Sequence, residues 1–150
     1  MLNTDAAESL TGWFTTTEPT STVFNLSSNN QINSSFGFTY IAYLFSSQPG
    51  VSKVGSYSGT GGDIDVDCGF AAGARFVLIK RTDSNGDWYV WDSARAIVSD
   101  NEPYLLLNET GSEVTNTDYI DPLNAGFTVT SSAPAALNAS GGTYLFLAIA

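Results

Sequence analysis

The chain carries the same order of landmarks twice, and this repeat limits the architectures that it can adopt. Residues 2–46 and 107–150 each hold a Leu-Asn pair followed by a glutamate, then an Asn-x-Ser step, then a Thr-Tyr pair that opens an apolar run. The two apolar runs are Thr39–Phe45 and Thr143–Ile149. Two segments with the same landmarks in the same order are predicted to have the same strand layout. A repeat of this kind favours a structural or binding part over an enzyme.

The segment between the two repeats occurs only once. The sequence therefore predicts a single β domain over residues 1–150, in which a half repeat (residues 1–46) precedes one complete unit (residues 47–150). The half repeat lacks a middle segment of its own, so its apolar strand is expected to pack on the complete unit or on a neighbouring copy. The residues expected to be buried there are Trp13, Phe14, Phe24, Ile41 and Tyr43.

The fold class follows from the polar composition and from short apolar segments. Charged residues make up 13% of the chain, about half of the usual ~25%, and Ser, Thr, Asn and Gly supply most of the remaining polarity. This balance indicates a sheet protein, because exposed helix faces usually carry Lys, Glu and Arg. Eight segments are predicted strands: Val23–Leu26, Tyr40–Phe45, Asp63–Cys68, Phe76–Lys80, Trp88–Trp91, Tyr104–Leu107, Phe127–Thr130 and Thr143–Ile149. Their number and spacing predict an all-β antiparallel sandwich or jelly roll.

Glycines mark two predicted connections. Phe76–Lys80 and Trp88–Trp91 are predicted to form a hairpin, with Asn85-Gly86 at its tip supplying the positive φ angles of a tight turn. Four glycines between residues 55 and 62 predict a flexible, exposed connection before the next strand.

Composition argues against several classes of function. The net charge of -10 disfavours nucleic acid, whose phosphates need Lys and Arg. The chain has no histidine and a single cysteine, Cys68, which rules out the usual nucleophilic triads, His-ligated zinc and an intramolecular disulfide. No N-terminal stretch resembles a signal peptide, and no apolar run reaches the 18 or so residues of a membrane span, so membrane insertion is not expected. We expect a protein that is not an enzyme and that needs no resident cofactor.

One acidic strand is the candidate metal site. Period-two alternation places Asp63, Asp65 and Asp67 on one face of a strand and Ile64 and Val66 on the other. Three carboxylates could bind a hard cation such as Ca²⁺, provided that another strand or backbone carbonyls complete the oxygen ligands. The alternative is a solvated outer face whose opposite face is buried, and this alternative carries more weight.

Four aromatic residues are the candidate binding or interface residues: Trp88, Tyr89, Trp91 and Tyr104. Their rings could stack on a sugar, because each combines an apolar face with a polar edge. Alternation sends Trp88 and Val90 to one face of the strand and Tyr89 and Trp91 to the other. One of these pairs is therefore expected in the core, and a core or subunit-interface role outweighs sugar binding.

The complete unit resembles a known family. The stretches that carry the resemblance are PGVSKVGSYSGTG at residues 49–61, FVLIKRTD at residues 76–83, WYVWDSAR at residues 88–95 and NASGGTY at residues 138–144. Together they resemble the repeat-containing structural proteins, described as tail-fibre or virion proteins, of tailed and often marine bacteriophages. The resemblance covers nearly the whole chain. It implies a component of the phage particle and does not specify which one.

The resemblance sets the functional expectation. The chain is expected to be a non-enzymatic virion structural protein, first a tail-fibre or host-recognition component, alternatively a capsid decoration protein, and less readily a free carbohydrate-binding module. Virion proteins of this kind occur in many symmetric copies, so a homo-oligomer such as a trimer is expected. The implied partners are further copies of the chain, other virion proteins and a host-surface glycan, with assembly in the bacterial cytoplasm.

Overall fold

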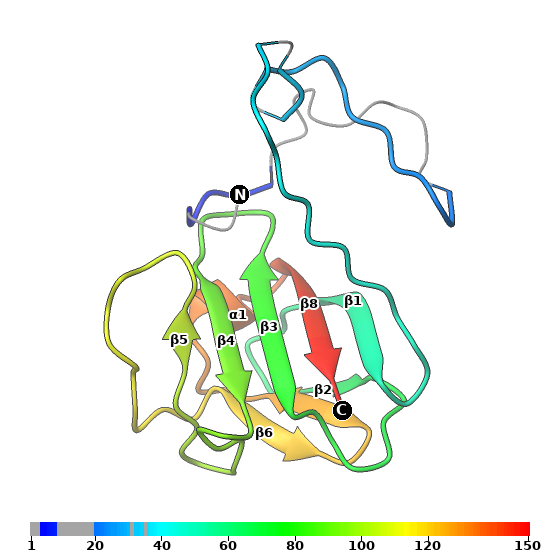
Figure 1. Ribbon diagram of the computed structural model, residues 1–150. Helices are drawn as coiled ribbons and strands as arrows, with labels where there is room; N and C mark the ends of the chain where they lie inside the picture. Colours follow the sequence, from blue (N-terminus) through cyan, green and yellow to red (C-terminus); the bar gives the residue numbers. More distant parts are fainter. Residues whose placement is uncertain (1–3, 9–19, 31, 35) are drawn as a thin grey trace. The chain divides into compact units, whose positions relative to one another are not determined.

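The computed structural model describes residues 4–8, 20–30, 32–34 and 36–150. The chain divides into two compact units, Met1–Glu8 with Phe45–Ala150 and Ser9–Leu44. Within the described residues, all strands and the one helix belong to the first unit (Figure 1).

The first unit is built from two antiparallel sheets, which confirms the predicted all-β fold. Its elements are β1 (Ser52–Ser58), β2 (Ile64–Asp67), β3 (Phe76–Arg81), β4 (Trp88–Asp92), β5 (Leu105–Leu106), β6 (Ile120–Leu123), β7 (Gly126–Val129), α1 (Ala135–Asn138) and β8 (Thr143–Ile149). The larger sheet has the order β1-β8-β3-β4-β5 and the smaller one β2-β7-β6. The first and last long strands of the unit are neighbours, since β1 pairs with β8 over its whole length.

The main core lies between the two sheets, which makes the unit a sandwich. One face of the larger sheet contributes residues such as Ile79, Trp91 and Phe146, and the smaller sheet contributes Ile120 and Phe127. Four of these five side chains, those of Ile79, Trp91, Ile120 and Phe127, are fully buried. The Phe127 ring meets the Phe146 ring edge-on, with 5.5 Å between the ring centroids. Alternation within each strand therefore places one face in the core, as the period of two requires.

The predicted hairpin is present, but its turn is not the predicted one. Strands β3 and β4 pair antiparallel from Phe76↔Asp92 to Lys80↔Trp88. Neither Asn85 nor Gly86 has a positive φ, so the expectation of a tight Asn-Gly turn is wrong. The loop is longer and is held by other contacts: Arg81 pairs with Asp83 at 3.0 Å, and the Gly86 N–H donates to the Asp5 carbonyl at 2.8 Å.

Glycine has a packing role where a flexible connection was expected. Gly55 lies within β1, which the sequence reading missed. A Cβ atom on Gly55 would lie 2.8 Å from the Phe146 ring, and one on Gly59 would lie 2.2 Å from the Ala139 carbonyl oxygen. The glycines therefore allow close approach of neighbouring groups. The missed strand β6 contains Pro122, which an edge strand tolerates.

The structure contradicts the expected equivalence of the two repeat segments. Thr143–Ile149 forms β8, whereas Thr39–Phe45 has no regular secondary structure. The physical reason lies in the neighbouring strands that each segment can pair with. Strand β8 gains its hydrogen bonds from β1 on one side and β3 on the other. Both partners belong to the segment that occurs once, so the half repeat contains no equivalent of either.

The Ser9–Leu44 unit, where described, consists of turns and extended chain. The Asn33 side chain donates to the Ser27 carbonyl at 2.9 Å, and the Tyr40 hydroxyl donates to the Asn30 carbonyl at 3.1 Å. Val23–Leu26, a predicted strand, forms only an isolated bridge at Leu26.

The burial expected for the half repeat is not found in the single chain. Ile41 is 82% exposed and Tyr43 is 69% exposed, and Phe24 is half-buried. Trp13 and Phe14 lie outside the described residues. Burial of Ile41 and Tyr43, on the complete unit or on a neighbouring copy, stays a prediction.

Candidate functional site

The acidic segment has the predicted alternation: Asp63, directly before β2, and Asp65 and Asp67 within it are exposed, and Val66 is buried. Each aspartate accepts a different hydrogen bond: Asp63 from the Ser131 N–H at 2.7 Å, Asp65 from the Thr128 hydroxyl at 2.7 Å, and Asp67 from the Gly69 N–H at 2.8 Å. Across the described residues, no group of three or more acidic, His or Cys side chains is arranged to hold a metal ion. The carboxylates lie on the face of the smaller sheet opposite Val66, where Asp65 meets Thr128 of β7, and calcium binding there stays a prediction.

The four candidate aromatic residues separate as alternation predicted. Tyr89, Trp91 and Tyr104 are buried and belong to the main core. Tyr89 stacks on Trp91 with 5.8 Å between the ring centroids, and Tyr104 packs on Tyr89 at 5.0 Å. Burial in this apolar cluster raises the pKa of the Tyr89 and Tyr104 hydroxyls. These three rings stabilise the core and are not available as an exposed sugar platform. Of the four candidates, only Trp88 lies on the outer face of the larger sheet.

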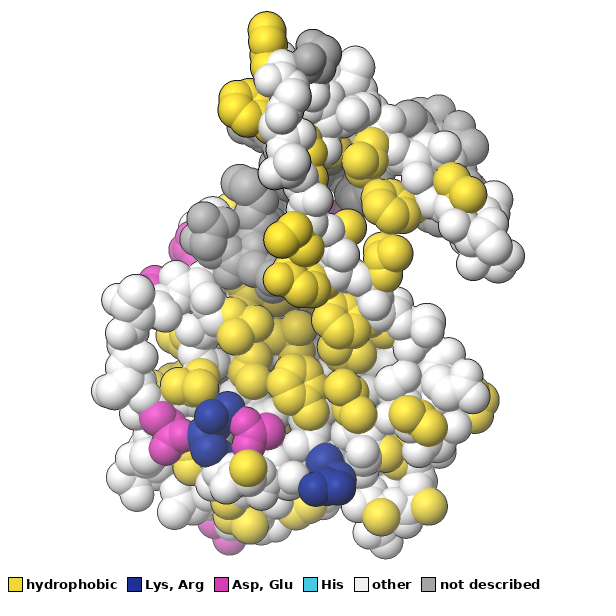
Figure 2. All heavy atoms as spheres, viewed as in Figure 1, with side chains coloured by type: hydrophobic (Ala, Val, Ile, Leu, Met, Phe, Trp, Pro, Cys, Tyr) yellow, Lys and Arg dark blue, Asp and Glu magenta, His cyan; other side chains and the backbone are white. Residues whose placement is uncertain are grey.

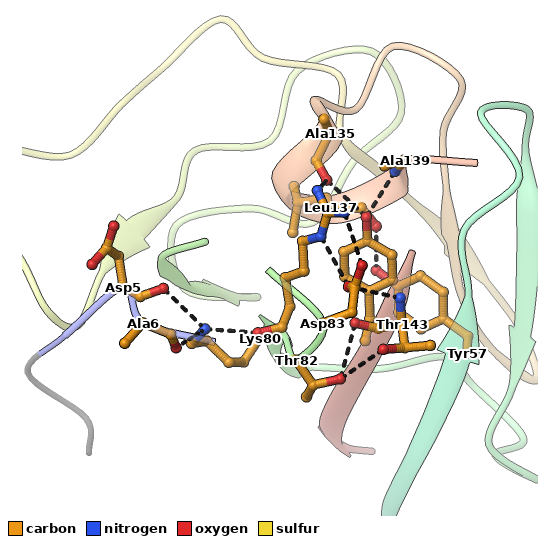
Figure 3. A network of polar contacts seen from close by, with 12 residues as sticks. Asp5, Ala6, Tyr57, Lys80, Thr82, Asp83, Ala135, Leu137, Ala139 and Thr143 are labelled. Atoms are coloured by element: carbon orange, nitrogen blue, oxygen red, sulfur yellow. Dashed lines mark hydrogen bonds and ion pairs between the residues drawn. The ribbon is translucent and has the colours of Figure 1, made fainter. Parts of the chain in front are cut away.

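Trp88 lies beside a buried lysine on the outer face of the larger sheet. The Lys80 ammonium is 5.9 Å from the centre of the Trp88 ring, within range of a cation–π interaction. The Lys80 side chain is only 4% exposed, and its Nζ donates to the carbonyls of Asp5 (3.3 Å), Ala6 (2.9 Å) and Arg81 (2.7 Å). Desolvation lowers the pKa of Lys80. The N-terminal residues thus cover this end of the sheet (Figure 3), a contact that the sequence reading missed.

An apolar row crosses the whole outer face of the larger sheet. One residue from each strand contributes to it, and each is the pairing partner of the next: Val54, Leu147, Leu78, Val90 and Leu105. We call this set the outer apolar row. Phe76 and Trp88 pack against its centre. Figure 2 shows hydrophobic side chains gathered over this sheet. Leu78, Val90 and Leu147 at its centre are buried, whereas Val54 is 40% exposed and Leu105 is half-buried. Exposed apolar surface at the ends of such a row is a place where a partner can bind.

A polar network closes the same end of the sandwich that the N-terminal residues cover (Figure 3). The Tyr144 hydroxyl donates to the Ala135 carbonyl and accepts from the Ala139 N–H, both at 2.7 Å. Asp83 accepts from the Thr143 N–H at 3.0 Å, and the Arg81 guanidinium and this N–H hold the pKa of the Asp83 carboxyl below its usual range. All of these residues except Ala135 belong to the FVLIKRTD and NASGGTY stretches. Two of the stretches that carry the family resemblance therefore meet in one structural network.

Glu102 is the one fully buried carboxylate among the described residues. Its Oε1 atom accepts the N–H groups of Tyr119 and, at 3.1 Å, of Ile120. Its Oε2 atom has no hydrogen-bond partner. Burial raises the pKa of this carboxyl, against the lowering effect of the two N–H donors. Glu102 thus anchors the start of β6, a role for which the sequence gives no signal, because Glu102 lies in no recognisable motif.

A second apolar surface lies in residues 36–45. Seven of these ten residues are large and hydrophobic, and all seven are exposed: Phe36, Phe38, Tyr40, Ile41, Tyr43, Leu44 and Phe45. No helix within the described residues is long and apolar enough to cross a membrane. Exposed apolar surface of this extent marks an interaction site or an aggregation liability.

Comparison with known proteins identifies the family without assigning an activity. The family model described as "Domain of unknown function (DUF7483)" matches residues 1–150, so the chain belongs to this family. No curated protein and no solved structure matches the chain.

Proposed function

We propose that this member of the DUF7483 family is a non-enzymatic structural protein of a bacteriophage virion, and that it serves as a tail-fibre component. The outer apolar row carries the proposal. Its residues Leu78, Val90 and Leu147 are already buried, but Val54 at one end is 40% exposed and Phe76, Trp88 and Leu105 are only partly buried. The exposed part of this apolar face suits burial against another protein.

The placement of the motif stretches also supports a structural role. The four stretches that resemble phage virion proteins form β1, β3 with its following loop, β4, and the polar network around Tyr144. They build the framework of the sandwich. Because the residues that carry the resemblance form this framework, the chain and the proteins that it resembles are expected to share an architecture. A shared architecture fits a repeated building block of a particle.

Capsid decoration is the second candidate, and one observation favours it. Tyr89, Trp91 and Tyr104 are buried, so they are not exposed for a host glycan as a receptor-binding tip would require. A decoration protein needs no glycan platform and would instead use the outer apolar row against the capsid shell.

The test is to locate the chain in particles. Virions purified from an infected host that encodes this chain would be examined by mass spectrometry and by immunogold electron microscopy with antibodies against it. We expect the chain in the particles, with gold on the tail. Gold on the head would support decoration instead, and absence of the chain from purified particles would contradict a virion role.

A further inference from the structure

Free sheet edges are the places where another chain can add a strand, and the sandwich has four of them. Three are protected. Strand β5 has two residues, β6 contains Pro122, and β2 carries exposed aspartates along its length. The fourth edge, β1, has seven residues with no proline and no acidic residue. Its one charged residue is Lys53 near its start, so residues 54–58 form a stretch of free edge without the charges and prolines by which proteins block strand addition.

The backbone groups along β1 are only partly satisfied on its free side. Gln48 exchanges both backbone hydrogen bonds with Ser52, at 2.9 Å each. The Ser47 hydroxyl accepts the Val54 N–H at 3.0 Å and donates to the Val54 carbonyl at 3.3 Å. By the two-residue period, the N–H and C=O groups of Ser56 and Ser58 also point away from β8. Both residues are exposed, and no described residue hydrogen-bonds to these groups.

The chain also carries a strand-forming sequence without a strand partner. Residues 39–45 repeat the landmarks of β8, the strand that pairs with β1 on its other side. They are rich in aromatic and apolar residues with high strand propensity. They are nevertheless exposed and outside any strand. A segment of this kind gains hydrogen bonds and burial by joining a sheet edge.

Charge makes a second copy of the chain the fitting partner. The chain has 15 acidic residues and a net charge of -10, so two copies repel each other over most of their surfaces. Residues 19–62, however, contain no Asp or Glu. This stretch includes both residues 39–45 and β1. Two copies can therefore approach through these elements without bringing carboxylates together.

We propose that residues 39–45 of one copy add to the free edge of β1 of a second copy as an extra antiparallel strand. The added strand forms hydrogen bonds with the backbone N–H and C=O groups of Ser56 and Ser58, and it extends the larger sheet to six strands. This inference rests on the proposed structural role and specifies how copies of the building block join.

The experiment uses one variant on each side of the contact. Ser56→Pro removes an N–H that points away from β8, so the β1–β8 pairing is retained while strand addition is blocked. Ser56→Thr is its matched control, since it keeps the N–H. Tyr43→Pro blocks the donor segment, and Tyr43→Val is the control that keeps both the N–H and the strand propensity. Far-UV circular dichroism establishes that each full-length variant is folded.

Association is measured by sedimentation velocity at micromolar concentrations. We expect wild type and both controls to form oligomers, and each proline variant alone to be monomeric. A mixture of the two proline variants is expected to form a 1:1 complex, because the intact residues 39–45 of the Ser56→Pro chain can add to the intact edge of the Tyr43→Pro chain. A monomeric wild type, an oligomer unaffected by Ser56→Pro, or a mixture that stays monomeric would each overturn the proposal. Folding of residues 39–45 onto the edge of their own chain would give the monomeric outcomes. Failure here leaves the virion assignment standing, since that depends on locating the chain in particles.

Discussion

At the scale of single residues, Glu102 is the group whose ionisation is most directly tied to folding. Burial raises its pKa above the ordinary 4.5, so the folded protein favours the protonated carboxyl more than the unfolded chain does. The stability from this preference is fully present below pH 4.5 and is lost as the pH rises through the raised value. We expect the melting temperature of the wild type to fall over this range. Glu102→Gln stays neutral and keeps an oxygen for the Tyr119 and Ile120 N–H groups, so its curve should be flatter.

Two further variants separate charge from hydrogen bonding at this position. Glu109→Gln removes an exposed carboxylate and is expected to follow the wild-type slope. Glu102→Ala leaves two N–H groups without an acceptor and is expected to lower stability by about 2–4 kcal/mol at every pH. Melting curves from pH 4 to 8 would check these expectations. Equal slopes for wild type and Glu102→Gln would show that this carboxyl is not the group that titrates.

At the scale of elements, α1 is held to the two sheets through Asn138, one of the landmarks of the repeat. Its Oδ1 atom accepts the N–H groups of Thr60 (3.0 Å) and Gly61 (3.1 Å), and its Nδ2 atom donates to the carbonyls of Gly62 (2.8 Å) and Thr130 (3.0 Å). Asn138→Ala removes all four bonds at a site only 3% exposed and is expected to cost about 3 kcal/mol or more. Asn138→Asp keeps the acceptor but turns a carboxylate oxygen toward the Gly62 and Thr130 carbonyls, so at neutral pH it is expected to destabilise at least as much as Asn138→Ala. Denaturant unfolding measures both, and a variant as stable as wild type would contradict this role.

The sequence predicted the elements better than their partners. Strands such as β3, β4 and β8 have long apolar runs, and for them local pattern is enough. Strand β1 was missed because a glycine such as Gly55 is typical of a loop. The structure needs a glycine at this position because the Phe146 ring, from the other end of the chain, packs directly against it. The strand equivalent to β8 was predicted at residues 39–45 and is absent, since hydrogen-bonding partners, which a local pattern does not contain, decide whether a strand forms. The burial of Tyr89 and Trp91 likewise depends on the second sheet.

At the scale of the whole molecule, the core and the proposed contact use different parts of the chain. Every residue of the main core lies between residues 57 and 148. A chain that begins at Phe45 therefore keeps the complete core and all eight strands. It loses the Asp5 and Ala6 carbonyls that accept from Lys80, but this ammonium lies on the outer face and can bond to water instead. We expect such a chain to fold with a modestly lower melting temperature.

The same truncation should abolish association. It removes residues 39–45 and leaves the β1 edge intact, so the truncated chain can accept a strand and cannot donate one. We expect it to sediment as a monomer by itself and to bind the full-length Ser56→Pro variant, whose donor segment is intact. Circular dichroism and sedimentation velocity check the fold and the association. A truncated chain that stays oligomeric would show that residues 39–45 are dispensable for assembly, and one that fails to fold would show that the N-terminal residues contribute more to the sandwich than its core indicates.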